Sequence, residues 1–342
     1  MRAFITGLAG TALTEAERAF LREAQPWGLI VFQRNVAGPL ALRRLIADCR
    51  SVLGRDVPVL VDQEGGRVAR LHPPHWAKYP PAAAYGRLYD RDRDEGLNAA
   101  RLGARLIAAD LAEVGIDVDC MPVADVPVPG ADAVIGDRAF ATEPDKVAAL
   151  AGSFAEGLAQ GGVLPVLKHI PGHGRAMADS HRKLPTVSAA KATLQATDFA
   201  AFRALAGLPL AMTAHVVFTA FDPLAPATTS AAIVRDVIRG FIGYRGLLMS
   251  DDLSMGALTG SLAERTRAAL AAGCDVALHC NGNMDEMREV AAATPLLDGD
   301  AARRAAAALA CKKPAAPIDV AAKRAEFSAL LCPVWKEAQG LV

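Results

Sequence analysis

Short apolar runs alternate with helical patterns along nearly the whole chain. Each run is five to eight residues long and is followed by a helical pattern or a long loop. The runs cover residues 3–7, 28–32, 57–61, 116–123, 163–167, 210–215, 246–252 and 274–279. Strands that are buried on both faces have continuous apolar runs, and their alternation with helices is typical of a parallel sheet. The 342 residues therefore predict one α/β domain over 1–342, a single (β/α)8 barrel of TIM type.

The segments between the runs carry local signals. Thr14 and Glu17 form a capping-box pattern that predicts the start of a helix. Residues 142–145 are expected to cap another helix. Residues 71–90 contain several prolines and are expected to be irregular, whereas the alanine-rich tail after about residue 300 is expected to add extra C-terminal helices.

Charge and hydropathy argue against some partners. Lys plus Arg and Asp plus Glu number 37 each, which gives no electrostatic support for a nucleic-acid partner or a membrane surface. No stretch approaches the roughly 20 apolar residues of a membrane span, and the apolar N-terminus is short for a signal core. We therefore expect a cytoplasmic monomer that has neither a nucleic acid nor a membrane as its partner.

The cysteines and the missing cofactor motifs narrow the chemistry. None of the six cysteines forms a Cys-x-x-Cys pair, so we interpret them as buried free thiols in a reducing compartment. Neither a Gly-x-Gly-x-x-Gly fingerprint nor a Walker-type phosphate loop is present. The sequence thus predicts no cofactor.

Nearly every predicted strand ends in polar residues. In a barrel of this type the active site lies at the carboxyl ends of the strands. The polar ends are residues 33–35, Asp62, Asp125, Lys168, His169, His215, Asp251, Asp252 and His279. Their convergence on one face predicts a catalytic site.

Asp251 and Asp252 close one apolar run. Because adjacent strand residues point to opposite sides, only one of the two carboxylates is expected to face the substrate. The other is expected to brace the site or to cap the helix that follows near Met255.

Residues 168–181 hold the densest group of titratable side chains. Asp179 can fix the tautomer of His181 and stabilise its charged form, which would make His181 a proton donor and acceptor; the alternative is an ordinary Asx-turn. Lys168, which with His169 ends a buried apolar run, could form a Schiff base or, more simply, donate hydrogen bonds to substrate hydroxyls. A buried Lys and His without function remain the structural alternative.

Two further groups have more than one interpretation. His169, His173, His181 and His215 could be a metal cluster, but the His-x-His pair usual at an early strand is missing, and we expect no metal. Residues 62–70 contain two acids, Asp62 and Glu64, and two arginines, Arg67 and Arg70, around a Gly-Gly turn. They could form an internal salt-bridge cluster that holds the loop, or they could present Asp62 and Arg70 to a polyhydroxylated ligand. Arg138, in another loop, has the same two interpretations.

Four motifs resemble glycoside hydrolase family 3, in particular its compact bacterial β-N-acetylglucosaminidases of peptidoglycan recycling. They are Asp62-Gln-Glu-Gly-Gly-Arg-Val68, Lys168-His-Ile-Pro-Gly-His-Gly174, Asp179-Ser-His181 and Ser250-Asp-Asp-Leu-Ser-Met255. The resemblance covers about residues 1–300, and the four motifs in this order are highly specific.

The resemblance implies a retaining hydrolysis of terminal N-acetylglucosamine from muropeptides of the GlcNAc–anhydroMurNAc type. Asp251 would be the nucleophile that forms a covalent glycosyl-enzyme, with His181 and Asp179 as the acid/base dyad. The sugar would be held by Asp62, Arg70, Arg138, Lys168 and His169. A Schiff-base lyase that uses Lys168, a metal-dependent hydrolase and a sugar-binding barrel without turnover remain the alternatives.

Overall fold

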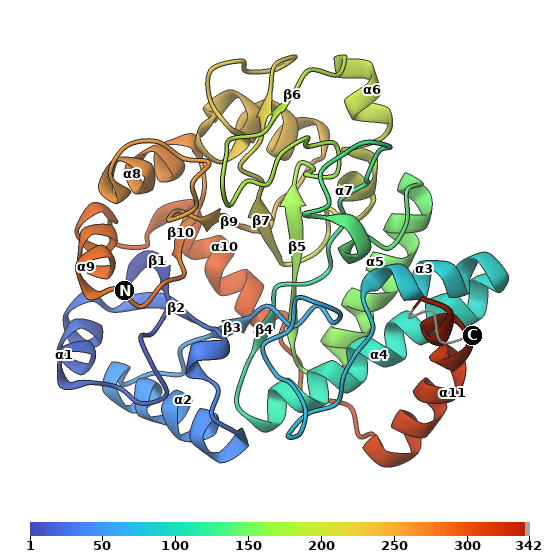
Figure 1. The fold of residues 1–342 in the computed structure, drawn as a ribbon. Helices are drawn as coiled ribbons and strands as arrows, with labels where there is room; N and C mark the ends of the chain where they lie inside the picture. The colour runs from blue at the N-terminus through green and yellow to red at the C-terminus, as the bar shows by residue number, and fades with distance from the viewer. Residues whose placement is uncertain (339–342) are drawn as a thin grey trace.

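The computed structural model describes residues 1–338 and contains a closed barrel of eight parallel strands (Figure 1). Around the barrel the strands follow the order β1-β10-β9-β7-β5-β4-β3-β2. Their bounds are β1 Arg2–Thr6, β2 Pro26–Val31, β3 Val59–Val61, β4 Val118–Asp119, β5 Leu164–Ile170, β7 Leu210–Thr213, β9 Leu247–Asp252 and β10 Val276–His279. Each predicted apolar run supplies one strand, which confirms the (β/α)8 fold.

Helices surround this ring of strands (Figure 1). The α-helices are α1 Glu15–Ala24, α2 Pro39–Leu53, α3 Ala82–Arg91, α4 Arg93–Glu113, α5 Pro144–Gln160, α6 Lys191–Ala196, α7 Ala200–Ala204, α8 Leu262–Ala272, α9 Met284–Ala293, α10 Gly299–Ala310 and α11 Val320–Ala338. Residues Ile233–Phe241 form a π-helix, and β6 (Thr186–Val187) pairs with β8 (Val217–Phe218) outside the barrel.

The local predictions have mixed outcomes. The capping box of Thr14 and Glu17 is present. The prediction that 71–90 is irregular is wrong at its end, because α3 begins at Ala82 after Pro81, which occupies the N-cap, and an alanine-rich start favours a helix. The expected helix start at 142–145 is confirmed, because Glu143 is the N-cap and Pro144 occupies the first turn, but Glu143 makes no side-chain cap hydrogen bond.

Two apolar cores hold the fold together. The outer core lies between the strands and the surrounding helices, whereas the inner core fills the barrel with alternate strand residues. Ala305 and Ala308 of α10 belong to the inner core, so this helix closes one end of the barrel. The other end, at the carboxyl ends of the strands, is left for polar groups.

Helix α11 packs beside α3 and α4 on the outside of the barrel (Figure 1). Phe327 lies 6.1 Å from the ring centroid of Tyr79 and 6.3 Å from that of Tyr85. Arg324 of the same helix forms an ion pair with Asp110 of α4. Helix α11 thereby covers an apolar face of the helical layer.

No helix within residues 1–338 combines the length and the apolar character needed to cross a membrane.

Cys49, Cys120 and Cys274 are buried free thiols as expected, and Cys280 is half-buried. Cys311 is exposed, because it follows the solvent-facing end of α10, so the expectation of burial is wrong there. The side chain of Cys332 lies outside the described residues.

Candidate active site

Strand alternation places one ring of side chains above the inner core. Leu60, Val166, Met249 and Leu278 point into the barrel. The residues two positions later point the same way, because side chains alternate along a strand. These residues are Asp62, Lys168, Asp251 and Cys280, and all four line one cavity of about 310 Å³. Arg70, Arg138, His169, Asp179 and His181 line it too.

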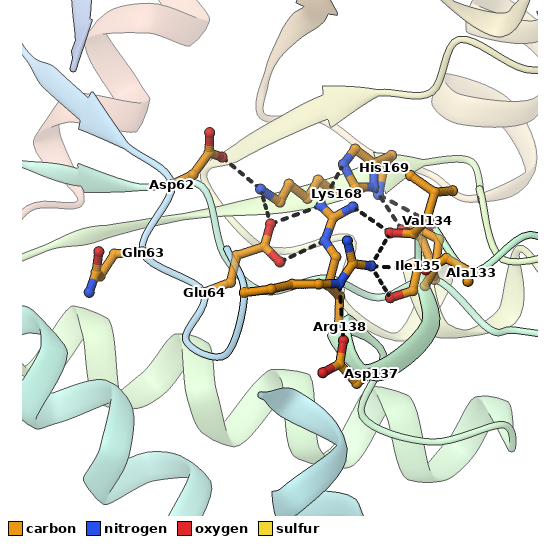
Figure 2. Close-up of polar contacts among 12 residues, drawn as sticks. Asp62, Gln63, Glu64, Ala133, Val134, Ile135, Asp137, Arg138, Lys168 and His169 are labelled. Atoms are coloured by element: carbon orange, nitrogen blue, oxygen red, sulfur yellow. Dashed lines mark hydrogen bonds and ion pairs between the residues drawn. The ribbon is translucent and has the colours of Figure 1, made fainter. Parts of the chain in front are cut away.

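A buried ion-pair network occupies one wall of this cavity (Figure 2). The Nζ of Lys168 lies 2.9 Å from Asp62 Oδ1 and 2.6 Å from Glu64 Oε1, and its side chain is only 2% exposed. Arg138 donates to both carboxylate oxygens of Glu64, at 2.8 and 2.9 Å. Arg70 donates to Asp62 at 3.0 Å. The cluster is therefore both a salt-bridge network and a lining of the cavity.

The network keeps its members ionised. Burial alone would lower the pKa of Lys168, but Asp62 and Glu64 raise it above its ordinary value. Burial would raise the pKa of Glu64, yet Arg138 and Lys168 lower it to about 2. An amine that attacks a carbonyl needs a lowered pKa. The protonated Lys168 thus argues against the Schiff-base lyase.

His169 is oriented by a buried carboxylate. Its Nδ1 lies 2.7 Å from Oδ2 of Asp125, which is fully buried. Asp125 also accepts from the backbone N–H of His173 at 2.6 Å. Burial would raise the pKa of Asp125, but His169 and the other donors lower it. Nδ1 of His169 is therefore the donor to Asp125. Nε2 of His169 lies 3.5 Å from Nη2 of Arg138 and is the ring nitrogen that remains for a ligand.

A second arginine holds the loop that carries Arg138. The Nη2 of Arg67 donates to the carbonyls of Ala133 and Val134 at 2.9 and 2.6 Å. Its Nε also lies 3.3 Å from Asp137 Oδ1. These contacts fix the backbone next to Arg138, whose guanidinium then reaches Glu64.

The two adjacent aspartates have different surroundings, as predicted. Asp251 lines the cavity, whereas Asp252 accepts from Ser254 Oγ at 2.6 Å and from the Cys280 N–H at 3.1 Å. Burial would raise the pKa of Asp251, but the imidazoles of His215 and His169 and the Asp252 N–H, which donates at 2.8 Å, lower it. Asp251 is thus an ionised carboxylate facing the cavity, and Asp252 is its brace.

Asp179 and His181 form a pair on the loop after β5. His181 Nδ1 lies 2.7 Å from Asp179 Oδ1, and the same oxygen accepts from the His181 backbone N–H at 2.9 Å. Burial would raise the pKa of Asp179, but these two hydrogen bonds lower it. The His181 side chain is 63% exposed. The imidazole is therefore tied to its carboxylate but is not enclosed by packing.

The four histidines do not form a metal cluster. His173 binds Ser180 Oγ through Nε2 at 2.9 Å, and His215 contacts Thr228 Oγ1 and the Asp252 carbonyl at 2.7 and 3.0 Å. In the described part of the chain, no three His, Cys, Asp or Glu side chains lie so that they could hold a metal ion.

The profile of the glycosyl hydrolase family 3 N-terminal domain matches residues 5–305. The chain belongs to glycoside hydrolase family 3. A β-hexosaminidase of Alkalilimnicola ehrlichii is 40% identical over 279 residues, which are 80% of this chain and 79% of that protein. A β-hexosaminidase of Chromobacterium violaceum is 39% identical over 292 residues, 84% of this chain and 81% of that protein.

Solved structures agree with the family assignment. NagZ from Neisseria gonorrhoeae, in complex with N-trifluoroacetyl-D-glucosamine, is 33% identical with a TM-score of 0.84, covering 97% of this chain and 96% of NagZ. The expected family and enzyme class, a glycoside hydrolase, are thereby confirmed.

The family 3 site also contains residues whose partners the sequence did not identify. Glu64 joins Lys168 to Arg138, Asp125 orients His169, and Arg67 holds the loop of Arg138. Glu64 and Arg67 lie in the first quoted motif, and Asp125 was among the polar strand ends. These positions, in a motif and at a strand end, are the only sequence signals that point to the three residues, because their partners are far away in the sequence.

We predict that Glu64→Gln lowers the free energy of unfolding by about 3 kcal/mol, because it leaves Lys168 and Arg138 with too little negative charge in a buried site. Asp137→Asn is the control, since the Asp137–Arg67 pair is half exposed and should contribute less than about 1 kcal/mol. Urea unfolding measures both. Equal losses of the free energy of unfolding in the two variants would contradict the proposed contribution of the buried network to stability.

The difference in the free energy of unfolding between wild type and Glu64→Gln should depend on pH. The folded-state pKa of Glu64, about 2, lies below its ordinary value of 4.5. The stabilisation is therefore complete above pH 4.5 and is lost as the pH falls toward 2. The difference in the free energy of unfolding between wild type and Glu64→Gln should therefore shrink as the pH falls from 4.5 toward 2. A difference that grows as the pH falls would contradict the lowered pKa of Glu64.

Proposed function

We propose that this enzyme is a retaining exo-β-N-acetylglucosaminidase that acts through a covalent glycosyl-aspartate. One observation carries the proposal: the ionised Asp251 on a rigid strand and the Asp179–His181 pair on a loop line the same cavity. A nucleophile and a proton donor at one small site are what a two-step glycoside hydrolysis requires. The β-hexosaminidase names of the relatives give the class of sugar.

Asp251 is the nucleophile in the first step. Its carboxylate oxygen attacks the anomeric carbon, and the bond from that carbon to the aglycone oxygen breaks. The lowered pKa of Asp251 keeps the carboxylate ionised, and its bond to the Asp252 N–H fixes one oxygen. The strand supplies a rigid position for the attack.

His181 moves the proton in both steps. Asp179 accepts from Nδ1–H, which leaves Nε2 for the transfer and stabilises the imidazolium form. The imidazolium protonates the departing aglycone oxygen. In the second step the neutral imidazole takes a proton from water, the hydroxide displaces Asp251 from the anomeric carbon, and the sugar leaves with its original configuration.

The remaining wall of the cavity holds the sugar. Asp62, Arg70, Arg138, Lys168 and His169 offer charged donors and acceptors for sugar hydroxyls. Ile30, Met212 and Leu278 form an apolar floor. A cavity of about 310 Å³ is at the small end of ligand sites, which supports removal of one terminal sugar at a time.

The natural substrate we propose is a peptidoglycan-derived muropeptide with a terminal N-acetylglucosamine on anhydroMurNAc. NagZ of Neisseria gonorrhoeae, an N-acylglucosamine-binding relative, supports the sugar. The aglycone is supported by the motif resemblance alone. A cytoplasmic monomer with one catalytic domain and no cofactor stays a prediction.

Hydrolysis of muropeptides against chitin fragments tests the aglycone. We expect kcat/KM for GlcNAc–anhydroMurNAc muropeptides to exceed that for chitobiose by about tenfold, the effect of roughly 1.4 kcal/mol of extra transition-state binding. Chromatography of the released sugar measures both rates. A preference for chitobiose would contradict the muropeptide assignment and leave the chemistry unaffected.

His181→Ala tests the acid/base role. The loss in kcat/KM should be about 100-fold or more for a glycoside with a poor leaving group, such as phenyl. A dinitrophenyl glycoside should lose far less, because its leaving group needs little protonation. His72→Ala, an exposed histidine outside the cavity, is the matched control. Equal losses on both substrates would remove His181 as the acid.

A further inference from the structure

The segment that carries His181 is attached to the loop that follows Asp251. The backbone N–H of Gly256 donates to the His181 carbonyl at 3.2 Å, and that of Ala257 donates to the Ser180 carbonyl at 3.1 Å. We call residues 253–258 the docking loop. It leaves β9 directly after Asp251 and Asp252. The acid/base segment and the nucleophile are therefore connected through one strand end.

The docking loop is itself held firmly. Asp252 accepts from the side chain of Ser254 at 2.6 Å and from its N–H at 3.1 Å. Arg265 of α8 donates to the carbonyls of Leu253 and Met255 at 2.9 and 3.3 Å. The loop thus offers two N–H groups from a fixed backbone.

The acid/base segment is anchored on its other side by Ser180. Ser180 is buried, and its Oγ lies 2.9 Å from Nε2 of His173. Burial lowers the pKa of His173 to about 4, so this imidazole is neutral at the pH of most assays. The exposed His181 side chain has no comparable packing. The position of the imidazole therefore depends on Asp179 and on these backbone anchors.

Gly256 permits the close approach of the two segments. A Cβ at this position would lie 2.9 Å from the His181 carbonyl oxygen and 3.1 Å from that of Arg182. Its three nearest atoms all belong to that segment. Residue 256 is otherwise exposed, and its backbone does not need the left-handed conformation. A methyl group there would act on the acid/base segment rather than on the core.

We propose that Gly256 and Ala257 are positioning residues that dock the acid/base segment onto the nucleophile strand. The docking sets where His181 delivers its proton relative to the carbon that Asp251 attacks. This inference rests on the roles proposed above for Asp251 and His181. It assigns a function to the docking loop, which contributes no side chain to the cavity wall.

Gly256→Ala tests the docking. A misplacement of about 1 Å can cost up to 100-fold in rate, so kcat/KM for the phenyl glycoside should fall by about 10- to 100-fold. The dinitrophenyl glycoside should change by less than about threefold, since it needs little protonation. Hydrogen–deuterium exchange in residues 176–184 should become faster, while the melting temperature stays within about 2 °C because residue 256 is exposed.

Gly207→Ala is the matched control, because a Cβ there meets nothing within 4 Å and the residue is exposed. It should match wild type on both substrates. Two results for Gly256→Ala would overturn the docking: kcat/KM values equal to those of wild type, or an equal loss of kcat/KM on both glycosides. If His181→Ala still shows the leaving-group dependence in that case, the proposed function stands. If His181→Ala lacks that dependence, the proposed function fails first.

Discussion

Lys168 carries a positive charge at the top of a barrel that is otherwise filled with apolar side chains. Asp62 and Glu64 make that charge tolerable, since a buried cation without paired carboxylates would cost several kcal/mol. Glu64 in turn binds Arg138, and Asp62 binds Arg70. The network thereby fixes side chains from strand β5 and from two loops around one wall of the cavity before any sugar enters.

The site divides its tasks between strand ends and loops. Asp251, Asp62 and Lys168 take their positions from strand alternation, which leaves them little freedom. His181 lies on a loop, is exposed, and is held by Asp179 and by backbone contacts with residues 256 and 257. The proposed chemistry matches this division. The nucleophile must be fixed, whereas the site beside the proton donor must also accept a water molecule in the second step.

The sequence predicts the strands well because each is a buried apolar run with a polar end. The same alternation indicates that one of Asp251 and Asp252 faces the cavity, and the structure shows that it is Asp251. Glu64 between Lys168 and Arg138, Asp125 behind His169, and Gly256 beside His181 could not be predicted, because each depends on contacts between distant segments. Helix α3 was missed because its prolines precede it rather than interrupt it.

Covalent trapping tests the central claim most directly. A 5-fluorinated N-acetylglucosaminide with an activated leaving group slows both steps, and the glycosyl-enzyme accumulates if the second step is slower. Peptide mass spectrometry should then find one sugar attached to Asp251, and Asp251→Ala should carry none. A label on Asp62, Glu64 or Lys168, or steady turnover of an ordinary aryl glycoside by Asp251→Ala, would contradict the account.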